Sequence, residues 1–264
     1  MKLLYSFIPW AIAIFSVNAM ASCEPVQFGY LDQHRPPYWL GRGSVVPDPP
    51  GASVELLKMF AASAGCPAMF KRLPVLRIKP ALVSGDIDIA PMDENGVHTA
   101  GIVFPRDKNE RLDSKRSVPQ VLVTFVRAAD HIPRSADPMN LFKGRLVGIT
   151  LGSAYAARLE QAGIKVDSGA IDLARNFDKL MLRRVDGFAI TLVSVDDLDA
   201  YVSQHYGRQV VRLSKPIYSD RIWLAANQRY YNLHRPEVEA MWTWLGTKGN
   251  KEFEVLLEKY SRIP

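Results

Sequence analysis

The residues best suited to chemistry begin with an aromatic pair on a stiff turn. Pro36-Pro37-Tyr38-Trp39 lies in a segment, 31–50, that is rich in proline and glycine and follows a predicted strand over 26–30. Proline restricts the backbone of such a turn and holds its neighbours in place. The two rings either pack against their own loop or form an apolar wall at the carboxyl end of a strand, where open α/β sheets bind small molecules. The sequence leaves both interpretations open.

A glycine and a hydroxyl residue mark a second candidate. Gly152-Ser153 follows a predicted strand, 146–150, and opens a predicted helix that runs to about Ala162. The first turn of a helix offers free backbone N–H groups and the positive end of the helix dipole, which together can hold an anion. Ser153 is therefore either a plain N-cap or part of an anion site, and the pattern by itself favours the cap.

A long polar segment, 91–116, contains many of the remaining reactive side chains. Segments of this length without regular structure are usually functional or mobile in a compact domain. Arg77, at the start of a predicted helix 77–83, is a further candidate, and its alternative role is an ion pair with Asp86 or Asp88. The reactive residues of the polar segment are Asp93, Glu94, His98, Arg106, Glu110, Arg111 and Arg116.

No catalytic or metal-binding motif occurs in the sequence. It lacks a nucleophile elbow, a His-Glu-x-x-His pair, clustered cysteines and a Walker loop, and its five histidines are scattered. We therefore expect a protein that is not an enzyme and that needs no metal and no cofactor. An enzyme would need a general acid in its cleft, and Glu94 and Glu110 are the candidates, although each also suits a plain surface position.

Composition and charge are those of an ordinary globular protein. The chain has 264 residues, 48% of them hydrophobic and 23% charged, which fits one large domain or two lobes. The formal net charge is +6, and no run of basic residues is longer than two. A surplus this small and this dispersed is not typical of a nucleic-acid-binding surface, so we expect no nucleic-acid partner.

Residues 1–21 have the pattern of a cleavable export signal. Lys2 supplies the positive start, residues 3–17 are mainly apolar, and Ala19-Met20-Ala21 matches a small-x-small cleavage site. We expect cleavage after Ala21 and a mature protein in the periplasm. Met20-Ala21-Ser22-Cys23 also resembles a bacterial lipoprotein box, so anchoring through Cys23 is the alternative.

Two cysteines, Cys23 and Cys66, make an even pair for an oxidising compartment. Cys23 precedes the first predicted strand and Cys66 follows the first predicted helix, and in an α/β unit these points can lie at the same end of the sheet. We predict a disulfide between them. The alternatives are a lipid on Cys23 or two free thiols.

The stretch 51–90 predicts helix, strand, helix and strand in that order. Val54, Leu57 and Phe60 recur at helical spacing, and a strand over 69–73 follows. The helix 77–83 comes next, with Pro80 tolerable only in its first turn, and then a buried strand over 87–90. The order indicates a mainly parallel sheet covered by helices. A similar pattern, in which a helix ends and an aspartate precedes an apolar strand, recurs over 177–190. The repetition indicates two similar lobes.

The rest of the chain supplies the predicted connections between lobes. A long strand over 118–126 leads to 127–130, which we expect to cross from one lobe to the other. A strand over 217–226 is expected to return, and two helices that Gly249 separates close the chain. The remaining predicted elements are strands over 164–166, 188–190 and 210–213 and helices over 174–182, 192–201, 236–245 and 251–260.

These patterns resemble the extracytoplasmic solute-binding proteins of ABC transporters, in the amino-acid-type family (solute-binding protein family 3). The residues that carry the likeness are Phe28-Gly29-Tyr30, Pro36-Pro37-Tyr38-Trp39, Gly51 with Val54-Glu55-Leu56-Leu57, Leu82 to Asp88, Val147-Gly148-Ile149 with Gly152-Ser153, and Arg184-Val185-Asp186. The resemblance implies the type II periplasmic-binding-protein fold, with two α/β lobes and two hinge crossings. We expect lobe 1 over 22–128 and 214–264 and lobe 2 over 129–213.

The resemblance also implies a ligand site. Tyr38 or Trp39 would supply its aromatic wall and Ser153 its hydroxyl. Arg111 is the nearest match to an arginine that clamps the ligand's carboxylate, with Arg106 or Arg116 as the alternatives. Asp93 belongs to the same predicted set. Where amino-acid binders carry an aspartate for the ligand's ammonium, this chain has Thr191. Since a buried ammonium without a carboxylate partner is costly, an acidic or neutral solute fits better than a standard α-amino acid.

The function that the resemblance implies is capture of a small polar or anionic solute in an interlobe cleft. The partners would be that solute and an inner-membrane ABC permease, and we expect a monomer. Two alternatives use the same fold: a dehydratase-like periplasmic enzyme, and an orphan sensory or accessory binding protein.

Overall fold

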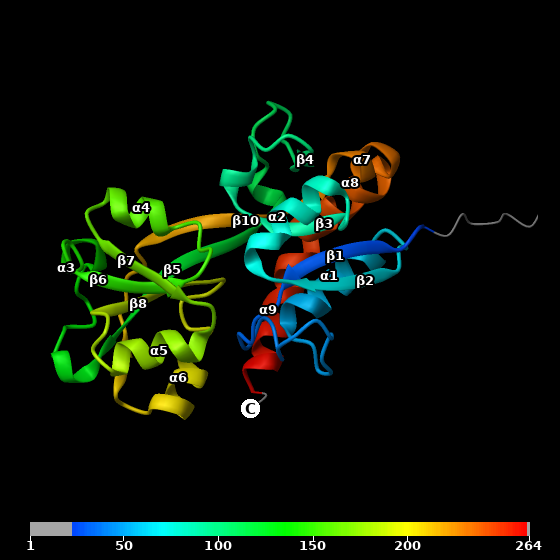
Figure 1. Cartoon of the computed structure of the whole chain (residues 1–264). Coiled ribbons are helices and arrows are strands. Elements are labelled where there is room, and N and C mark those ends of the chain that lie inside the picture. The colour runs from blue at the N-terminus through cyan, green and yellow to red at the C-terminus, as the bar shows by residue number, and fades with distance from the viewer. Residues whose placement is uncertain (1–22, 263–264) are drawn as a thin grey trace, which may run out of the picture.

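The computed structural model describes residues 23–262, which form two lobes joined by two long strands (Figure 1). Strands and helices alternate through both lobes, so the predicted α/β class is confirmed. The predicted export signal and its cleavage site lie outside the described residues. Within residues 23–262, no helix has both the length and the apolar character that crossing a bilayer requires.

Lobe 1 is built on a sheet whose first three strands are parallel. β1 (Val26–Leu31) lies between β2 (Ala68–Leu73) and β3 (Ile89–Met92). Gly29 lets Ile87 pack directly over β1, because a Cβ at this position would lie 2.1 Å from the Ile87 Cδ1 atom. Asp88 accepts a hydrogen bond from the backbone N–H of Gln27 at 2.8 Å. This contact ties the start of β3 to β1.

Helix α1 (Ala52–Ala62) buries the face that its periodicity predicts. Val54, Leu57 and Phe60 are buried against the lobe 1 sheet and the C-terminal helix α9 (Asn250–Ser261). The other helical elements of this lobe are α2 (Val75–Ser84), α7 (Gln228–Leu233), α8 (Arg235–Trp244), the 3-10 turns η1 (Glu94–Gly96) and η2 (Ser114–Arg116), and the π-turn η4 (Leu245–Gly249). Because η4 joins α8 to α9 without a break, Gly249 does not separate the two helices as expected.

Helix α2 begins two residues earlier than predicted, and this shift changes the position of its proline. Pro80 lies in the helix interior rather than in the first turn. Proline has no N–H, so the carbonyl of Leu76 loses its helical donor. Both residues lie on the exposed side of the helix, where water can satisfy that carbonyl.

Glu55 links α1 to α9 and provides a test of the packing of lobe 1. Its carboxylate accepts hydrogen bonds from the Tyr260 hydroxyl at 2.6 Å and from Lys259 Nζ at 2.9 Å. Burial opposes ionisation of Glu55, but these bonds outweigh it and hold the pKa of the carboxyl below its usual value. We expect Glu55→Gln to lower the free energy of unfolding by about 1 kcal/mol at neutral pH.

The difference between wild type and Glu55→Gln should depend on pH. A lowered folded-state pKa stabilises the protein above the unfolded pKa, and this stabilisation is lost as pH falls through the folded pKa. Denaturant unfolding should therefore give a constant difference at neutral pH that shrinks below the ordinary glutamate pKa of 4.5. A difference that grows as the solution is acidified would contradict the assignment.

Lobe 2 repeats the plan of lobe 1. β6 (Leu146–Thr150) lies between β7 (Lys165–Ala170) and β8 (Gly187–Leu192), and all three strands are parallel. Asp186, which precedes β8, accepts from the Leu146 N–H at 2.9 Å, as Asp88 does from Gln27 in lobe 1. The helices of this lobe are α3 (Pro138–Leu141), α4 (Ala156–Gln161), α5 (Leu173–Met181) and α6 (Asp199–Tyr206).

The helix predicted over 192–201 is displaced towards the C-terminus. β8 continues to Leu192, and residues 193–198 form a turn before α6 begins at Asp199. Asp197 stabilises this turn, because its carboxylate accepts from the Ser194 N–H at 2.7 Å. Local hydrogen bonding of this kind competes with helix formation.

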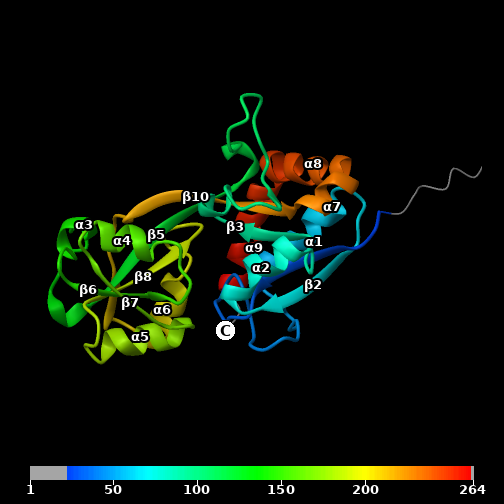
Figure 2. The same ribbon diagram turned by 45° about the horizontal axis from the view of Figure 1, so that its top comes forward.

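Two long strands, β5 (Val118–Arg127) and β10 (Tyr218–Asn227), connect the lobes. They run side by side between the lobes in Figure 1 and Figure 2, and they are antiparallel. The second half of β10 pairs with β3 in lobe 1, whereas β5 pairs with β8 over 121–125. Two short strands, β4 (Ile102–Val103) and β9 (Val210–Arg212), pair with β10 and β5 respectively.

The pairing of β5 bears on where the chain passes between lobes. Residues 127–130, expected at the crossing, lie instead at the far end of lobe 2, where the Arg127 guanidinium bonds the carbonyls of Leu180 and Val185. They follow the part of β5 that is already paired with β8. We therefore propose a first crossing near residues 117–120, earlier than the predicted boundary at 128.

The predicted disulfide between Cys23 and Cys66 is present, with a Cα–Cα distance of 4.7 Å. Cys23 lies just before β1 and Cys66 just before β2, so the bond fastens the parallel pair of strands at one end. With both sulfur atoms in the disulfide, neither the lipid on Cys23 nor the two free thiols applies to this structure.

Candidate functional site

A cavity of about 410 Å³ lies between the two lobes. Lobe 1 contributes the turn after β1 and the loop after β3, whereas lobe 2 contributes the turn after β6 and the end of β8. The hinge strands β5 and β10 line it as well. The polar and charged side chains of the lining are Gln33, Arg35, Ser53, Lys79, Asp93, Asn95, Gln120, Thr150, Ser153 and Thr191, together with the hydroxyl-bearing Tyr30, Tyr38 and Tyr155.

Five of the seven predicted ligand-binding residues line this cavity: Tyr38, Trp39, Asp93, Ser153 and Thr191. Trp39 stacks on Tyr30 with ring centroids 5.1 Å apart and is only 8% exposed. Trp39 therefore fits both interpretations of the aromatic turn, since it packs within lobe 1 and also borders the cavity.

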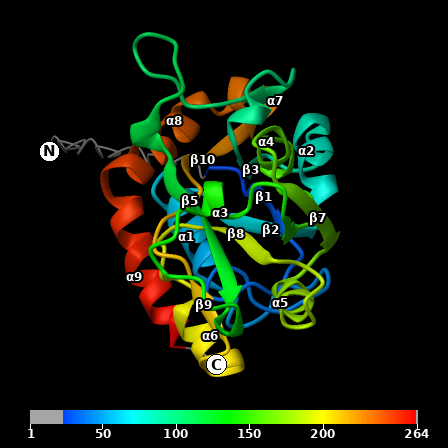
Figure 3. The same cartoon turned by 90° about the vertical axis from the view of Figure 1, so that its left-hand side faces the viewer.

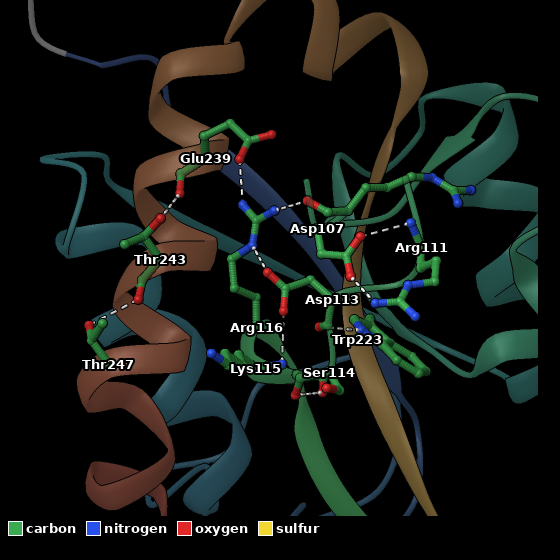
Figure 4. A network of polar contacts seen from close by, with 12 residues as sticks. Asp107, Arg111, Asp113, Ser114, Lys115, Arg116, Trp223, Glu239, Thr243 and Thr247 are labelled. Carbon is green, nitrogen blue, oxygen red and sulfur yellow. Dashed lines mark hydrogen bonds and ion pairs between the residues drawn. The ribbon is translucent and has the colours of Figure 1, made fainter. Parts of the chain in front are cut away.

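Arg111 does not reach the cavity, and this corrects the expectation that it clamps a carboxylate. It lies in the loop between β4 and β5, which projects away from both sheets (Figure 1, Figure 2, Figure 3). Its side chain is 74% exposed and pairs with Asp107 at 3.2 Å. The loop has its own network (Figure 4), in which Arg116 binds Asp113 and reaches Glu239 of α8.

Arg77 and the alternative arginines are also outside the cavity lining. Arg77 is exposed on α2, and no ion pair of the described residues joins it to Asp86 or Asp88. Arg106 donates to the Glu110 carbonyl at 2.7 Å, within the same projecting loop. The long polar segment was a poor guide to the ligand site, because several of its charged side chains form hydrogen bonds within the segment itself.

Arg35 is the cavity arginine that the sequence analysis missed. It immediately precedes the Pro36-Pro37-Tyr38-Trp39 turn, and backbone hydrogen bonds between Arg35 and Trp39 close that turn. Its Nη2 donates to the Thr191 Oγ1 atom of lobe 2 at 3.2 Å. Its guanidinium lies 5.3 Å from the centre of the Tyr38 ring, close enough for a cation–π interaction. Its position beside the aromatic turn was the available signal.

The positive charge of the Arg35 guanidinium has few hydrogen-bond or ionic partners. Its buried Nε has no hydrogen-bond partner, and among the described residues Arg35 forms no ion pair. Burial lowers the pKa of Arg35, although nearby Tyr38 and Asp197 partly offset that effect. Since a buried charge is stable only when it is paired and hydrogen-bonded, the site has an unmet demand for an anion.

Tyr38 bridges the lobes beside Arg35. Its hydroxyl donates to the Asp197 carboxylate and accepts from the Val193 N–H at 2.7 Å. Burial raises the pKa of the Tyr38 hydroxyl well above its usual value, and the neighbouring Asp197 adds to the effect. Burial likewise raises the pKa of Asp197. The described conformation is therefore one in which the lobes touch directly.

The opposite side of the cavity is closed by Gly152. This residue has φ +76°, and a Cβ on it would lie 2.8 Å from Val75 of α2 in lobe 1. A side chain there would meet both a strained backbone and the other lobe, so glycine suits the position. The turn carrying Ser153 can thus approach lobe 1 closely.

Ser153 belongs to a turn rather than to a helix cap. Helix α4 begins at Ala156 with Tyr155 as its N-cap, later than predicted. The Ser153 N–H donates to the Thr150 carbonyl at 3.0 Å, and its Oγ accepts from the Tyr155 N–H at 3.4 Å. The chain's own turn therefore holds the hydroxyl beside the cavity, which Tyr155, the N-cap of α4, also lines.

A hinge network supports the same turn. Gln120 of β5 donates to the Tyr155 hydroxyl at 3.1 Å, and this hydroxyl donates to Asp220 of β10 at 3.2 Å. Asp220 also pairs with Arg158 at 2.5 Å, and Arg158 lies over the Tyr218 ring. Burial, and then Asp220, raise the pKa of Tyr155. Movement of the hinge strands would therefore shift Tyr155 and the turn that contains Ser153.

The charges of the cavity are few. Besides Arg35, the charged residues of the described lining are Lys79, which is exposed at the edge, and Asp93. Asp93 caps the turn η1, because its Oδ1 accepts from the Asn95 N–H at 3.0 Å. No carboxylate from lobe 2 lines the described cavity, since Asp197 binds Tyr38 outside it.

Comparison with solved structures identifies the fold. The ligand-binding core of GluR0 in complex with L-glutamate matches with a TM-score of 0.68 at 12% identity, over 92% of this chain and 99% of that one. An ancestral arginine-binding protein bound to glutamine matches with a TM-score of 0.63 at 21% identity, over 89% and 97%. A double mutant of the Bordetella pertussis BvgS VFT2 domain matches with a TM-score of 0.64 at 18% identity, over 89% and 93%.

These matches confirm the two-lobed type II periplasmic-binding-protein fold that the sequence predicts. The likeness extends to amino-acid-binding proteins of this fold, as the resemblance implied. No family model matches the chain, and no curated protein matches it either.

The Tyr38 bridge gives a prediction for the lobe arrangement. Tyr38→Phe keeps the ring but removes the hydroxyl that serves both Asp197 and the Val193 N–H. At about 1 kcal/mol for each hydrogen bond, the closed arrangement should lose about 2 kcal/mol relative to an open one. Small-angle scattering should show a larger radius of gyration. Tyr231→Phe, which removes a contact to Glu239 within lobe 1, should leave the radius unchanged, and an equal effect of both variants would contradict the bridge.

Proposed function

We propose that this chain is an exported solute-binding protein that captures a small anionic molecule between its lobes. The observation that carries the proposal is the cavity of about 410 Å³, to which both lobes contribute and in which Arg35 lacks an ionic partner. Its volume falls within the roughly 300–1,000 Å³ of small-ligand pockets. Arg35 takes the clamping role that the sequence analysis assigned to Arg111.

Capture works by a shift in the balance between open and closed lobes. A ligand that binds residues of both lobes stabilises the closed form by its additional contacts. Here Arg35 and Tyr38 approach from lobe 1 and Thr191 and Ser153 from lobe 2, while β5 and β10 act as the hinge. The bridge from Tyr38 to Asp197 adds to closure without any ligand, so the ligand needs to supply only part of the free energy.

A standard α-amino acid is not the solute that the site favours. The described lining of lobe 2 presents the Thr191 hydroxyl beside Arg35 rather than a carboxylate. Asp93 is partly engaged with its own backbone. An ammonium group near Arg35 would therefore meet a cation and a hydroxyl, which is unfavourable in a desolvated site.

For the cellular role we propose delivery of the solute to an inner-membrane ABC permease, by a monomer in the periplasm. The disulfide is consistent with an oxidising compartment. A dehydratase-like activity has less support, because Glu94 and Glu110, the candidate general acids, are exposed and do not line the cavity. A sensory or accessory role would use the same capture and differ only in the partner.

The test is ligand-induced closure. Tryptophan fluorescence can screen a panel of small carboxylates, amino acids and neutral solutes, because Trp39 borders the cavity. Small-angle scattering of the protein with each compound that binds should then show a decrease in the radius of gyration, and calorimetry should show one molecule bound per chain. If no compound of any class binds, or if binding is unaffected when the cavity is filled, the function is wrong.

A further inference from the structure

The cavity combines one under-compensated cation with a largely apolar wall. Arg35 has a buried Nε without a partner, and its one side-chain hydrogen bond goes to the neutral Thr191. Around it the lining includes Leu31, Ile78, Met92, Val118, Ile190 and Ile222, drawn from both lobes and both hinge strands. The site thus offers one place for negative charge and a hydrophobic surface for the remainder of a ligand.

Three of the polar groups elsewhere in the lining are committed to protein partners. Gln120 Nε2 donates to Tyr155, Asp93 accepts from the Asn95 N–H, and the Tyr38 hydroxyl binds Asp197 and Val193. Ligand hydroxyls or charges that face these committed groups or the aliphatic wall would be left unpaired. Leaving a polar group unpaired in a desolvated site costs more free energy than a hydrogen bond there would contribute to binding.

From this pattern, and building on the proposed function, we propose that the ligand is a monocarboxylate with an apolar, aromatic or branched body and without an ammonium group. The carboxylate accepts hydrogen bonds from the Arg35 guanidinium in the two-pronged manner that arginine favours. The apolar body lies against the aliphatic wall between the lobes. Thr191 stays neutral, so that the charge of Arg35 remains available to the ligand.

Four matched probes separate the parts of this proposal by isothermal calorimetry. 3-Phenylpropionate has the carboxylate and the apolar body, L-phenylalanine adds an ammonium, phenethylamine lacks the carboxylate, and propionate lacks the ring. We expect 3-phenylpropionate to bind at least tenfold more tightly than each of the others. Equal or tighter binding of L-phenylalanine, or of a polar dicarboxylate, would overturn the proposed ligand class.

Two sets of variants test the contact at Arg35. Arg35→Met keeps much of the side-chain volume and should weaken 3-phenylpropionate about 100-fold, whereas Arg77→Met, on an exposed residue outside the cavity lining, should not change it. Thr191→Asp places a carboxylate beside Arg35 and should weaken the same probe at least tenfold, whereas Thr243→Asp, on an exposed threonine outside the cavity lining, should not. Both aspartate variants keep Arg35 in place, so a folding defect in Arg35→Met does not decide the test.

The outcomes also distinguish this proposal from the function on which it rests. If an amino acid or a polar solute closes the lobes while 3-phenylpropionate does not bind, capture stands and the ligand class is wrong. If 3-phenylpropionate binds equally to wild type and to Thr191→Asp, the carboxylate does not meet Arg35 and the proposal fails. If no small molecule binds at all, both the class and the function fail.

Discussion

Replacing Ala154 with tryptophan should abolish capture of the solute while leaving the fold intact. Ala154 lies on the exposed turn after β6 and lines the cavity, so a large side chain can enter the cleft without displacing core residues. A ring that occupies the ligand's place removes most of its contacts, and we expect affinity for any captured solute to fall by at least 100-fold, or about 3 kcal/mol. Calorimetry with the best solute measures the loss.

The matched control is Ala129→Trp. Ala129 is equally exposed but lies in the 3-10 turn η3 (Ala128–Asp130), which is not part of the cavity lining. The affinity of Ala129→Trp for the solute should equal that of the wild type, and thermal unfolding should show both variants to be folded. Retention of wild-type affinity by Ala154→Trp would place the bound solute somewhere other than between the lobes.

Removing the disulfide should produce the largest loss of stability. Cys23 and Cys66 are separated by 43 residues. Closing a loop of this length in the unfolded chain is worth about 4 kcal/mol on the loop-entropy account. The Cys23→Ser, Cys66→Ser double variant should therefore lose about 4 kcal/mol in free energy of unfolding by guanidinium titration, because the bond fastens the end of β1 to that of β2.

Reduced wild-type protein provides the comparison for that variant. It should unfold at nearly the same denaturant concentration as the double serine variant, because both lack the cross-link. Ligand affinity should change little in the folded protein, since neither cysteine lines the cavity. A double variant within 1 kcal/mol of the oxidised wild type would mean that the bond constrains little of the unfolded chain.

The fold could be predicted because its signals are local and repeated. Helix α1 places Val54, Leu57 and Phe60 on one buried face, as their spacing predicts. Aspartates before β3 and β8 accept from a neighbouring strand in both lobes, which explains why the same phrase occurs twice. The starts of elements were less predictable. Turn hydrogen bonds, rather than apolar periodicity, precede α4 and α6, which both begin later than expected.

The site was harder to predict because its decisive contacts join distant residues. Arg35 and Thr191 are 156 positions apart in the sequence. No local motif spans such a distance. The choice of Arg111 rested on its place in a polar segment, yet a charged residue in a loop can serve the loop itself, as Asp107 and Arg111 do. Tyr38 was identified because the aromatic turn is a local feature, whereas its partner Asp197 depends on how the lobes meet.

Native mass spectrometry of protein isolated from its own host tests the central claim most directly. Such protein should carry one small molecule per chain, which denaturation releases and which Ala154→Trp protein from the same host lacks. A molecule carried equally by both proteins would contradict capture between the lobes. So would a wild-type protein that stays empty even after exposure to a small-molecule extract of that host.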